Sequence, residues 1–166
     1  MPIVMMEYDP VLDALIDLAL SEDLGTGDLT TELCVNADQK IDATVIAKTD
    51  LVVSGIKPFH RVFEKVDDSV VLKWAVDEGA LVKSGTTLVN LSGKARSLLI
   101  GERVALNFLG RLCGIASQAY EWGLVNRIVP REELLPTCHA LAQDMLSCVP
   151  EVMSEYKRQI DHAYDL

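Results

Sequence analysis

Residues 40–47 read KIDATVIA, and the fold class follows most directly from this stretch because its apolar side chains recur at every second position. Ile41, Ala43, Val45 and Ala47 alternate with mostly polar neighbours, which is typical of a strand with one buried face. Short apolar segments follow at residues 51–53 and 70–74, and Gly79 and Gly85 punctuate the chain after them. Glycines between short alternating segments indicate the tight turns of a small antiparallel sheet.

Helical patterns surround these strands. Asp9 followed by Pro10 has the form of a helix N-terminus, and apolar residues recur at helical spacing until Gly25. Residues 25–31 are predicted to form a loop, residues 58–66 a helix, and residues 95–112 a long helix that Gly114 caps. The order of elements predicts an α+β fold, a hammerhead-like antiparallel sheet with covering helices, over residues 1–117.

The pattern changes after Ser117. Pro130 opens a helix with acidic residues in its first turn, and Pro150 opens a second one. Residues 118–166 are therefore predicted to be a separate C-terminal segment, an α-helical hairpin.

Composition limits the classes of function. The chain has 166 residues, a formal net charge of −10, 49% hydrophobic residues and a mean hydropathy of +0.21. A charge of this sign disfavours nucleic acid as a partner. We find no apolar run long enough for a transmembrane helix and no secretory signal at the start, so we expect a cytoplasmic protein without a membrane partner. The apolar surplus predicts subunit interfaces, and hence a homo-oligomer, with a dimer favoured.

Cysteine and histidine give no sign of a metal site or a nucleophile. None of the cysteines forms a CxxC pair, so they are predicted to be buried, reduced thiols; they are Cys34, Cys113, Cys138 and Cys148. The histidines lie far apart and are predicted to be surface or interface residues; they are His60, His139 and His162.

Two motifs carry a family resemblance. EDLGTGDLTT at residues 22–31, and ERVALNFL at residues 102–109 followed by Gly114, resemble the signatures of the N-terminal domain of quinolinate phosphoribosyltransferases, enzymes of NAD biosynthesis. The resemblance covers residues 1–117. Gly110 stands where the family usually has a long polar residue, and Cys113 stands where it usually has Ser.

The resemblance implies a substrate role for Arg103. In the family the matching guanidinium reaches a carboxylate of the pyridine dicarboxylate quinolinate, across a dimer interface and into the neighbour's barrel. A planar guanidinium suits this task because it donates two parallel hydrogen bonds to a carboxylate. From residue chemistry alone, Arg103 is equally compatible with a solvated helix residue. No catalytic, cofactor-binding or metal-binding residue is assigned, because the family's barrel binds Mg²⁺ and phosphoribosyl pyrophosphate, and no barrel pattern follows Ser117.

The tail resembles a different superfamily. AYEWGLVNRIVP at residues 119–130 is similar to the C-terminal segment of enoyl-CoA hydratase/isomerase (crotonase) proteins, which would allow Lys157 to approach coenzyme A phosphates. The chain is thus interpreted as a joined pair of enzyme fragments, not catalytic alone. Four alternatives stay open: acyl-CoA binding, a non-enzymatic oligomerisation module, a helper subunit that lends Arg103 to a separate barrel chain, and a carrier domain. Residues 78–85 resemble the turn pattern of biotinyl- and lipoyl-carrier domains but lack the flanked lysine that such carriers need.

Overall fold

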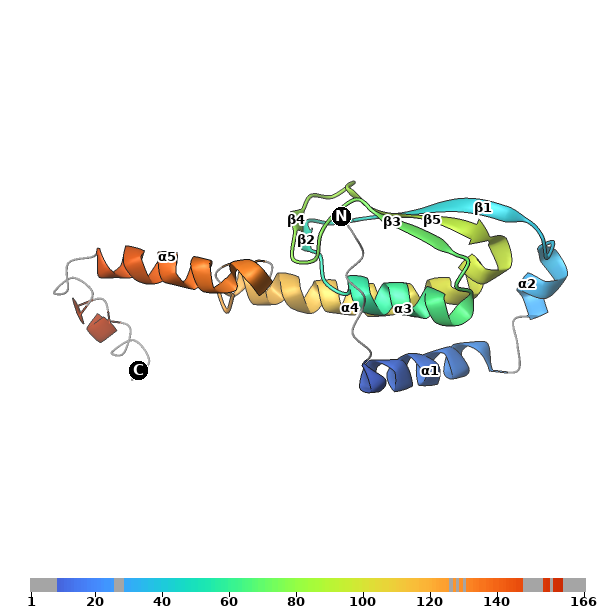
Figure 1. Cartoon of the computed structure of the whole chain (residues 1–166), viewed down its shortest axis with the longest axis horizontal. Coiled ribbons are helices and arrows are strands. Elements are labelled where there is room, and N and C mark those ends of the chain that lie inside the picture. Colours follow the sequence, from blue (N-terminus) through green and yellow to red (C-terminus); the bar gives the residue numbers. More distant parts are fainter. Residues whose placement is uncertain are drawn as a thin grey trace. The chain divides into compact units, whose positions relative to one another are not determined.

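A computed structural model of the chain describes residues 9–25, 29–125, 127, 129, 131–147, 154–155 and 157–159 (Figure 1). The chain divides into two compact units, Met1–Arg127 and Ile128–Leu166. The predicted family junction near Ser117 therefore lies inside the first unit, and the change of ancestry at that point stays a prediction.

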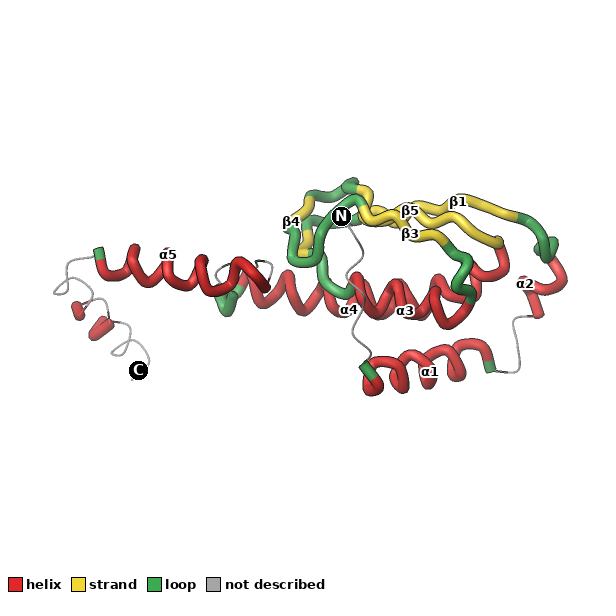
Figure 2. The backbone as a smooth tube through the Cα atoms, in the orientation of Figure 1, coloured by secondary structure: helices red, strands yellow, loops and turns green. Residues whose placement is uncertain are grey.

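The first unit is a mixture of helices and small antiparallel sheets, which confirms the predicted α+β class (Figure 2). Its helices are α1 (Pro10–Leu24), α2 (Leu29–Cys34), α3 (Ile56–Val66) and α4 (Ala95–Glu121). Its strands are β1 (Lys40–Ile46), β2 (Leu51–Val52), β3 (Val71–Trp74), β4 (Leu81–Val82) and β5 (Thr87–Lys94). The strands form a sheet in the order β1-β5-β3 and a separate β2-β4 ribbon, all antiparallel.

The core lies between the β1-β5-β3 sheet and the helices α3 and α4, with α1 beyond them (Figure 1). Phe59 and Phe63 of α3 are buried, and the ring of Phe59 meets Trp74 edge-on at 5.3 Å between centroids. Burying a side chain of this size stabilises a fold by about 1.5–3 kcal/mol. Residues of β5 and α4 complete the core: Leu88, Val89, Leu91, Leu98, Val104, Ala105 and Leu109.

Side-chain ion pairs attach α1 to α3. The Asp9 carboxylate accepts hydrogen bonds from the backbone N–H groups of Val11 and Leu12 at 3.1 Å, as its predicted N-cap role requires. Farther along α1, both oxygens of Asp13 accept from the Arg61 guanidinium at 2.7 Å. These hydrogen bonds hold the pKa of Asp13 below its usual value.

The long helix α4 extends beyond its predicted end, so the C-cap assigned to Gly114 is wrong. The helix ends at Glu121 with Trp122 as its C-cap, and the next residue, Gly123, has a left-handed φ of +68°. The Gly123 N–H donates to the Tyr120 carbonyl at 3.1 Å, and the Leu124 N–H donates to the Ala119 carbonyl at 3.0 Å. These bonds define a Schellman motif. The helix continues through Gly114 because Ser117 docks it: the Ser117 hydroxyl accepts from the Val52 N–H at 2.9 Å.

The predicted loop at residues 25–31 is also partly wrong. Gly25 ends α1 as predicted, but α2 begins at Leu29, and residues 26–28 lie outside the described part of the chain. Threonines have weak helix propensity, so the local sequence favours a loop. A tertiary contact overrides that preference, because the Arg96 guanidinium of α4 donates to the Val35 carbonyl at 2.8 and 2.9 Å and holds the end of α2.

Burial of the cysteines is confirmed for Cys113 and wrong for Cys34 and Cys138, which are exposed. Cys34 ends the short helix α2, and Cys138 lies on α5 (Leu134–Leu146) of the second unit, where an α-helix follows a 3-10 turn at Arg131–Glu133. Cys148 lies outside the described residues. The first arm of the predicted hairpin is therefore present, whereas most of its second arm falls outside the described residues.

Alanine substitutions at two glycines of α4 should have opposite effects on the free energy of unfolding. A Cβ at Gly101 would lie 2.7 Å from Cε1 of the buried Phe63 ring, so Gly101→Ala should lower the free energy of unfolding by about 1–3 kcal/mol. A Cβ at Gly110 meets nothing within 4 Å, so Gly110→Ala should raise it by about 0.5–1 kcal/mol. Denaturant unfolding of both variants measures the difference; equal effects would contradict the assigned packing of α3 on α4.

Acid stability should depend on Asp67, which links the end of α3 to the start of α4. Hydrogen bonds from Ser69 and Ser97 lower the pKa of Asp67 from 3.8 to about 2. Since the folded-state pKa is the lower one, the stabilisation is present above about pH 4 and is lost as the pH falls towards 2. Asp67→Asn should reduce the loss of unfolding free energy between about pH 4 and pH 2. The expected reduction is about 1 kcal/mol after solvent screening. Ser97→Ala should reduce this loss by a smaller amount. If unfolding free energy depends on pH in the same way in both variants and in the unsubstituted chain, ionised Asp67 does not stabilise the fold.

Candidate functional site

The candidate site is centred on Arg103, the residue that the sequence singles out. Nη1 of Arg103 lies 2.7 Å from Oδ1 of Asp23, in the last turn of α1. The Arg103 side chain is 75% exposed and that of Asp23 only 16%. One edge of the guanidinium is thus held against α1 while most of the group remains open to solvent.

This ion pair joins the two sequence motifs. Asp23 belongs to the first motif and Arg103 to the second, and 80 positions separate them along the chain. An exposed ion pair stabilises a protein by only about 0–1 kcal/mol. Its larger effect is on direction, because it restricts the rotamers of a long side chain that would otherwise sweep through solvent.

The packing around α4 determines where Arg103 points. Gly101 lies against the Phe63 ring, and the Ser97 hydroxyl donates to Oδ2 of Asp67 at 2.6 Å. These contacts fix the first turns of α4 against α3. Because successive helix positions are about 100° apart, Arg103 then meets α1 while Glu102 lines a groove on another side of the helix.

That groove, the β1–α4 groove, has a volume of about 830 Å³. Its floor is apolar and includes Phe59, Phe63 and Leu91, whereas its rim carries Lys48, Asp50, Glu102 and Glu121. Sequence reasoning missed both this groove and the Asp23 partner of Arg103. The signal for Asp23 was its presence in the first motif; no local pattern could reveal the groove, which depends on how β1 and α4 are placed.

The other residues considered from sequence do not gather around Arg103. Nδ1 of His60 lies 3.2 Å from Oε1 of Glu64, one turn along α3. His139 and Lys157 are exposed in the second unit, and His162 lies outside the described residues. Lys83 is held 2.7 Å from Oδ2 of Asp50, which raises the pKa of the Lys83 amine.

Within the described ranges, no group of three or more His, Cys, Asp and Glu side chains is arranged to hold a metal ion. In the same part of the chain, no helix is long and apolar enough to span a membrane.

Comparison with known proteins identifies the class to which this domain belongs. Residues 28–113 match the family described as quinolinate phosphoribosyl transferase, N-terminal domain. The chain belongs to this family.

Individual relatives agree with this assignment. A quinolinate phosphoribosyltransferase [decarboxylating] 1b from Nicotiana tabacum is 40% identical over 111 residues, 66% of this chain and 31% of the relative. A probable nicotinate-nucleotide pyrophosphorylase [carboxylating] from Bacillus subtilis is 34% identical over 110 residues, 66% of this chain and 38% of the relative. The crystal structure of NadC from Streptococcus pyogenes is similar with a TM-score of 0.63 and 34% identity, over 68% of this chain and 40% of that one.

This chain thus spans well under half the length of these relatives. The family match ends at residue 113, so the similarity of residues 118–166 to crotonases stays a prediction. Plant relatives are named as chloroplastic or mitochondrial, and the cytoplasmic location predicted from sequence stays a prediction as well.

Removing the carboxylate of Asp23 tests the anchoring of Arg103. Asp23→Asn should lower the free energy of unfolding by no more than about 1 kcal/mol, because the Arg103 partner of Asp23 is largely solvent-exposed. A double-mutant cycle with Arg103→Ala should give a small coupling energy that vanishes in about 1 M salt. A coupling that persists at high salt would contradict an exposed, screened ion pair.

Proposed function

We propose that this chain is a substrate-positioning domain for phosphoribosyl transfer to a pyridine dicarboxylate such as quinolinate. The observation that carries the proposal is the Arg103 guanidinium, exposed to solvent yet tied to Asp23 so that one ion pair joins the two family motifs. The names of the relatives support the reaction class.

The chemistry of Arg103 suits this role. A guanidinium stays charged at any physiological pH and presents a planar fork to a carboxylate, which fixes the orientation of the bound group as well as its position. Because Asp23 holds one edge of the fork, Arg103 loses less rotamer entropy when it meets a substrate.

Positioning is one part of the reaction. Phosphoribosyl transfer develops positive charge on the ribosyl centre and negative charge on the departing pyrophosphate, and both need stabilising groups. We assign those groups to a barrel-bearing subunit and propose that Arg103 reaches the substrate carboxylate across a dimer interface, as the family resemblance implies. The chain would then act as a binding partner whose separate turnover is negligible.

A chimaeric enzyme tests the proposal. Residues 9–117 of this chain would replace the matching domain of the Streptococcus pyogenes relative, and formation of nicotinate mononucleotide from quinolinate and phosphoribosyl pyrophosphate would be measured with Mg²⁺. We expect turnover by the chimaera and a fall in kcat/KM of at least about 100-fold on Arg103→Ala, the usual cost of removing a charged substrate anchor. The free chain, assayed alone, should form no product.

Arg111→Ala is the matched control, because Arg111 is an exposed arginine on the same helix. It should leave kcat/KM within about twofold of the unsubstituted chimaera. If Arg103→Ala and Arg111→Ala have equal effects in a folded chimaera, Arg103 does not contact the substrate. If the free chain forms product, the proposal that a separate barrel-bearing subunit carries out the transfer is wrong.

A further inference from the structure

The β1–α4 groove opens along the free edge of the sheet. Residues 43–51 line it without interruption, together with Ile41. Successive strand residues point to opposite faces of a sheet, so a groove against one face alone would touch every second residue of β1. Contact with consecutive residues places the opening beside the backbone of β1.

β1 is an edge strand of the described sheet. It pairs with β5 on one side, and the order β1-β5-β3 places no other described strand beside it. Its outward N–H and C=O groups therefore line the groove as a row of potential hydrogen-bonding partners, about 23 Å long for its seven residues.

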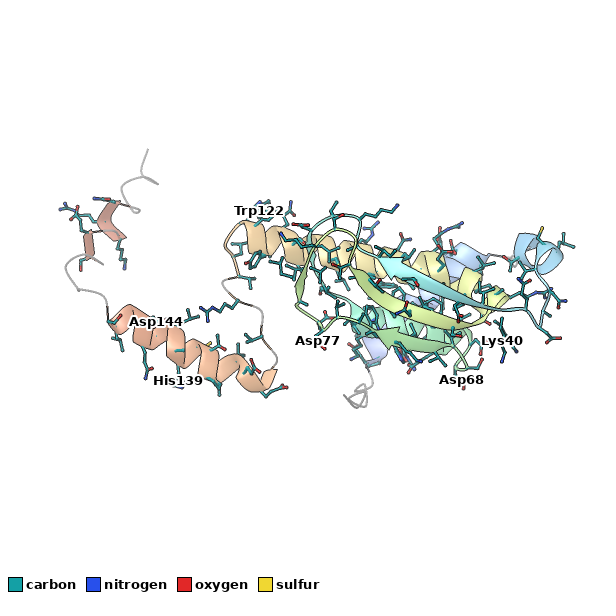
Figure 3. All side chains as sticks on the ribbon, turned by 90° about the horizontal axis from the view of Figure 1, so that it is seen from above. Lys40, Asp68, Asp77, Trp122, His139 and Asp144 are labelled. Atoms are coloured by element: carbon teal, nitrogen blue, oxygen red, sulfur yellow. The ribbon has the colours of Figure 1, made fainter. Side chains whose placement is uncertain are left out.

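The opposite wall of the groove is α4. The lining positions recur every three or four residues, so they form one stripe of the helix; they are Leu98, Leu99, Glu102, Leu106, Leu109, Gly110, Cys113, Gly114, Ser117 and Glu121. Leu99 and Leu106 in this stripe are 43% and 38% exposed. Figure 3 shows Lys40, where β1 begins, and Trp122, just past α4, towards opposite ends of the first unit. A segment in the groove would thus have a polar backbone on one side and apolar side chains on the other.

The rim of the groove is acidic. Glu102 and Glu121 extend from the helical wall and Asp50 from the opposite one, and Lys48 is the one Lys or Arg among the described residues that line it. Asp50 is paired with Lys83 at 2.7 Å. The remaining charges of the rim are the carboxylates of Glu102 and Glu121 and the amine of Lys48, which together leave a net charge of −1.

We propose that the β1–α4 groove binds an extended, alternating apolar and basic segment of a partner polypeptide, which adds to β1 as an antiparallel or parallel strand. Main-chain hydrogen bonds to the edge of β1 hold such a segment, its apolar side chains enter between Leu99 and Leu106, and its basic side chains meet Glu102 and Glu121.

Two other occupants fit less well. A helix would fill the apolar floor but would leave the edge of β1 without hydrogen-bonding partners in a space closed to water. A second copy of this chain, paired β1 to β1 about a two-fold axis, would bring two Glu102 walls together and join two molecules of net charge −10. The observations therefore favour a basic, extended segment.

Peptide binding to the full chain tests this proposal. The probe is a capped nine-residue peptide in which valine alternates with lysine, and the matched peptide has the same composition with all valines in one block. We expect the alternating peptide to bind at least about tenfold more tightly, because only alternation separates apolar and basic side chains on an extended backbone. Hydrogen exchange of the amides at residues 40–46 should slow on binding, while that of residues 71–74 on the other sheet edge should not change.

Variants of the chain locate the binding surface. Leu106→Ser should weaken binding about fivefold, and Glu102→Gln about two- to fivefold with a smaller dependence on salt. Ile115→Ser is the control, because Ile115 is a 66% exposed apolar residue of α4 outside the groove. Glu102→Gln is a surface change that keeps the test valid if Leu106→Ser does not fold.

Four outcomes would overturn the proposal. Equal affinity of the two peptides, or no measurable binding at millimolar concentration, would show that the groove does not accept a strand. Equal weakening by Ile115→Ser would place the peptide elsewhere. A dimer in sedimentation experiments that dissociates on Leu106→Ser would assign the groove to a second copy of the chain.

Discussion

The contact between Gly101 and the Phe63 ring is the constraint on which the rest of the structure depends. A Cβ at position 101 would lie 2.7 Å from Cε1 of Phe63 and would collide with the ring. Because glycine has no Cβ, α3 and α4 can approach each other closely. Close approach buries the aromatic cluster of Phe59 and Phe63 against the sheet and fixes the axis of α4. Arg103 and the β1–α4 groove both take their positions from that axis.

Apolar packing and charge have separate roles in this domain. The buried residues of α3, β5 and α4 supply the stability, since each large side chain removed from water contributes about 1.5–3 kcal/mol. The ion pairs of Asp13 with Arg61 and of Asp23 with Arg103 lie nearer the surface and contribute less, but they specify how α1 is placed over α3 and α4. A side chain such as that of Arg103, held in this way, stays exposed while its orientation is restricted.

The family assignment and the groove concern different surfaces of α4. Arg103 contacts Asp23 of α1, whereas Glu102 and Leu106 line the groove beside β1, so the proposed substrate contact and the proposed strand binding use different sides of the helix. Gly110 adds to the openness of the groove, because a Cβ there would meet no atom within 4 Å apart from the nearby backbone of its own helix and its chain neighbours. Gly110 therefore contributes no side chain to the wall of the groove.

Local sequence patterns were sufficient to predict β1, the N-terminus of α1 at Asp9 and the α+β class, because hydrophobic periodicity and helix capping are properties of neighbouring residues. The two motifs also led correctly to the family. Local pattern failed at Gly114, where docking of Ser117 on Val52 carries the helix onward, and at residues 29–31, where Arg96 stabilises the end of a helix that threonines disfavour. It also failed for Cys34 and Cys138, since burial depends on what packs against a residue.

The amino-acid order alone therefore determined the types of the elements and their approximate limits, and it predicted Arg103 as the candidate substrate-binding residue. The pairing of Arg103 with Asp23, the free edge of β1 and the acidic rim of the groove arose only when the chain was folded. Each of these features joins residues that are far apart in sequence, and the forces that bring them together act through packing in three dimensions, which no local periodicity records.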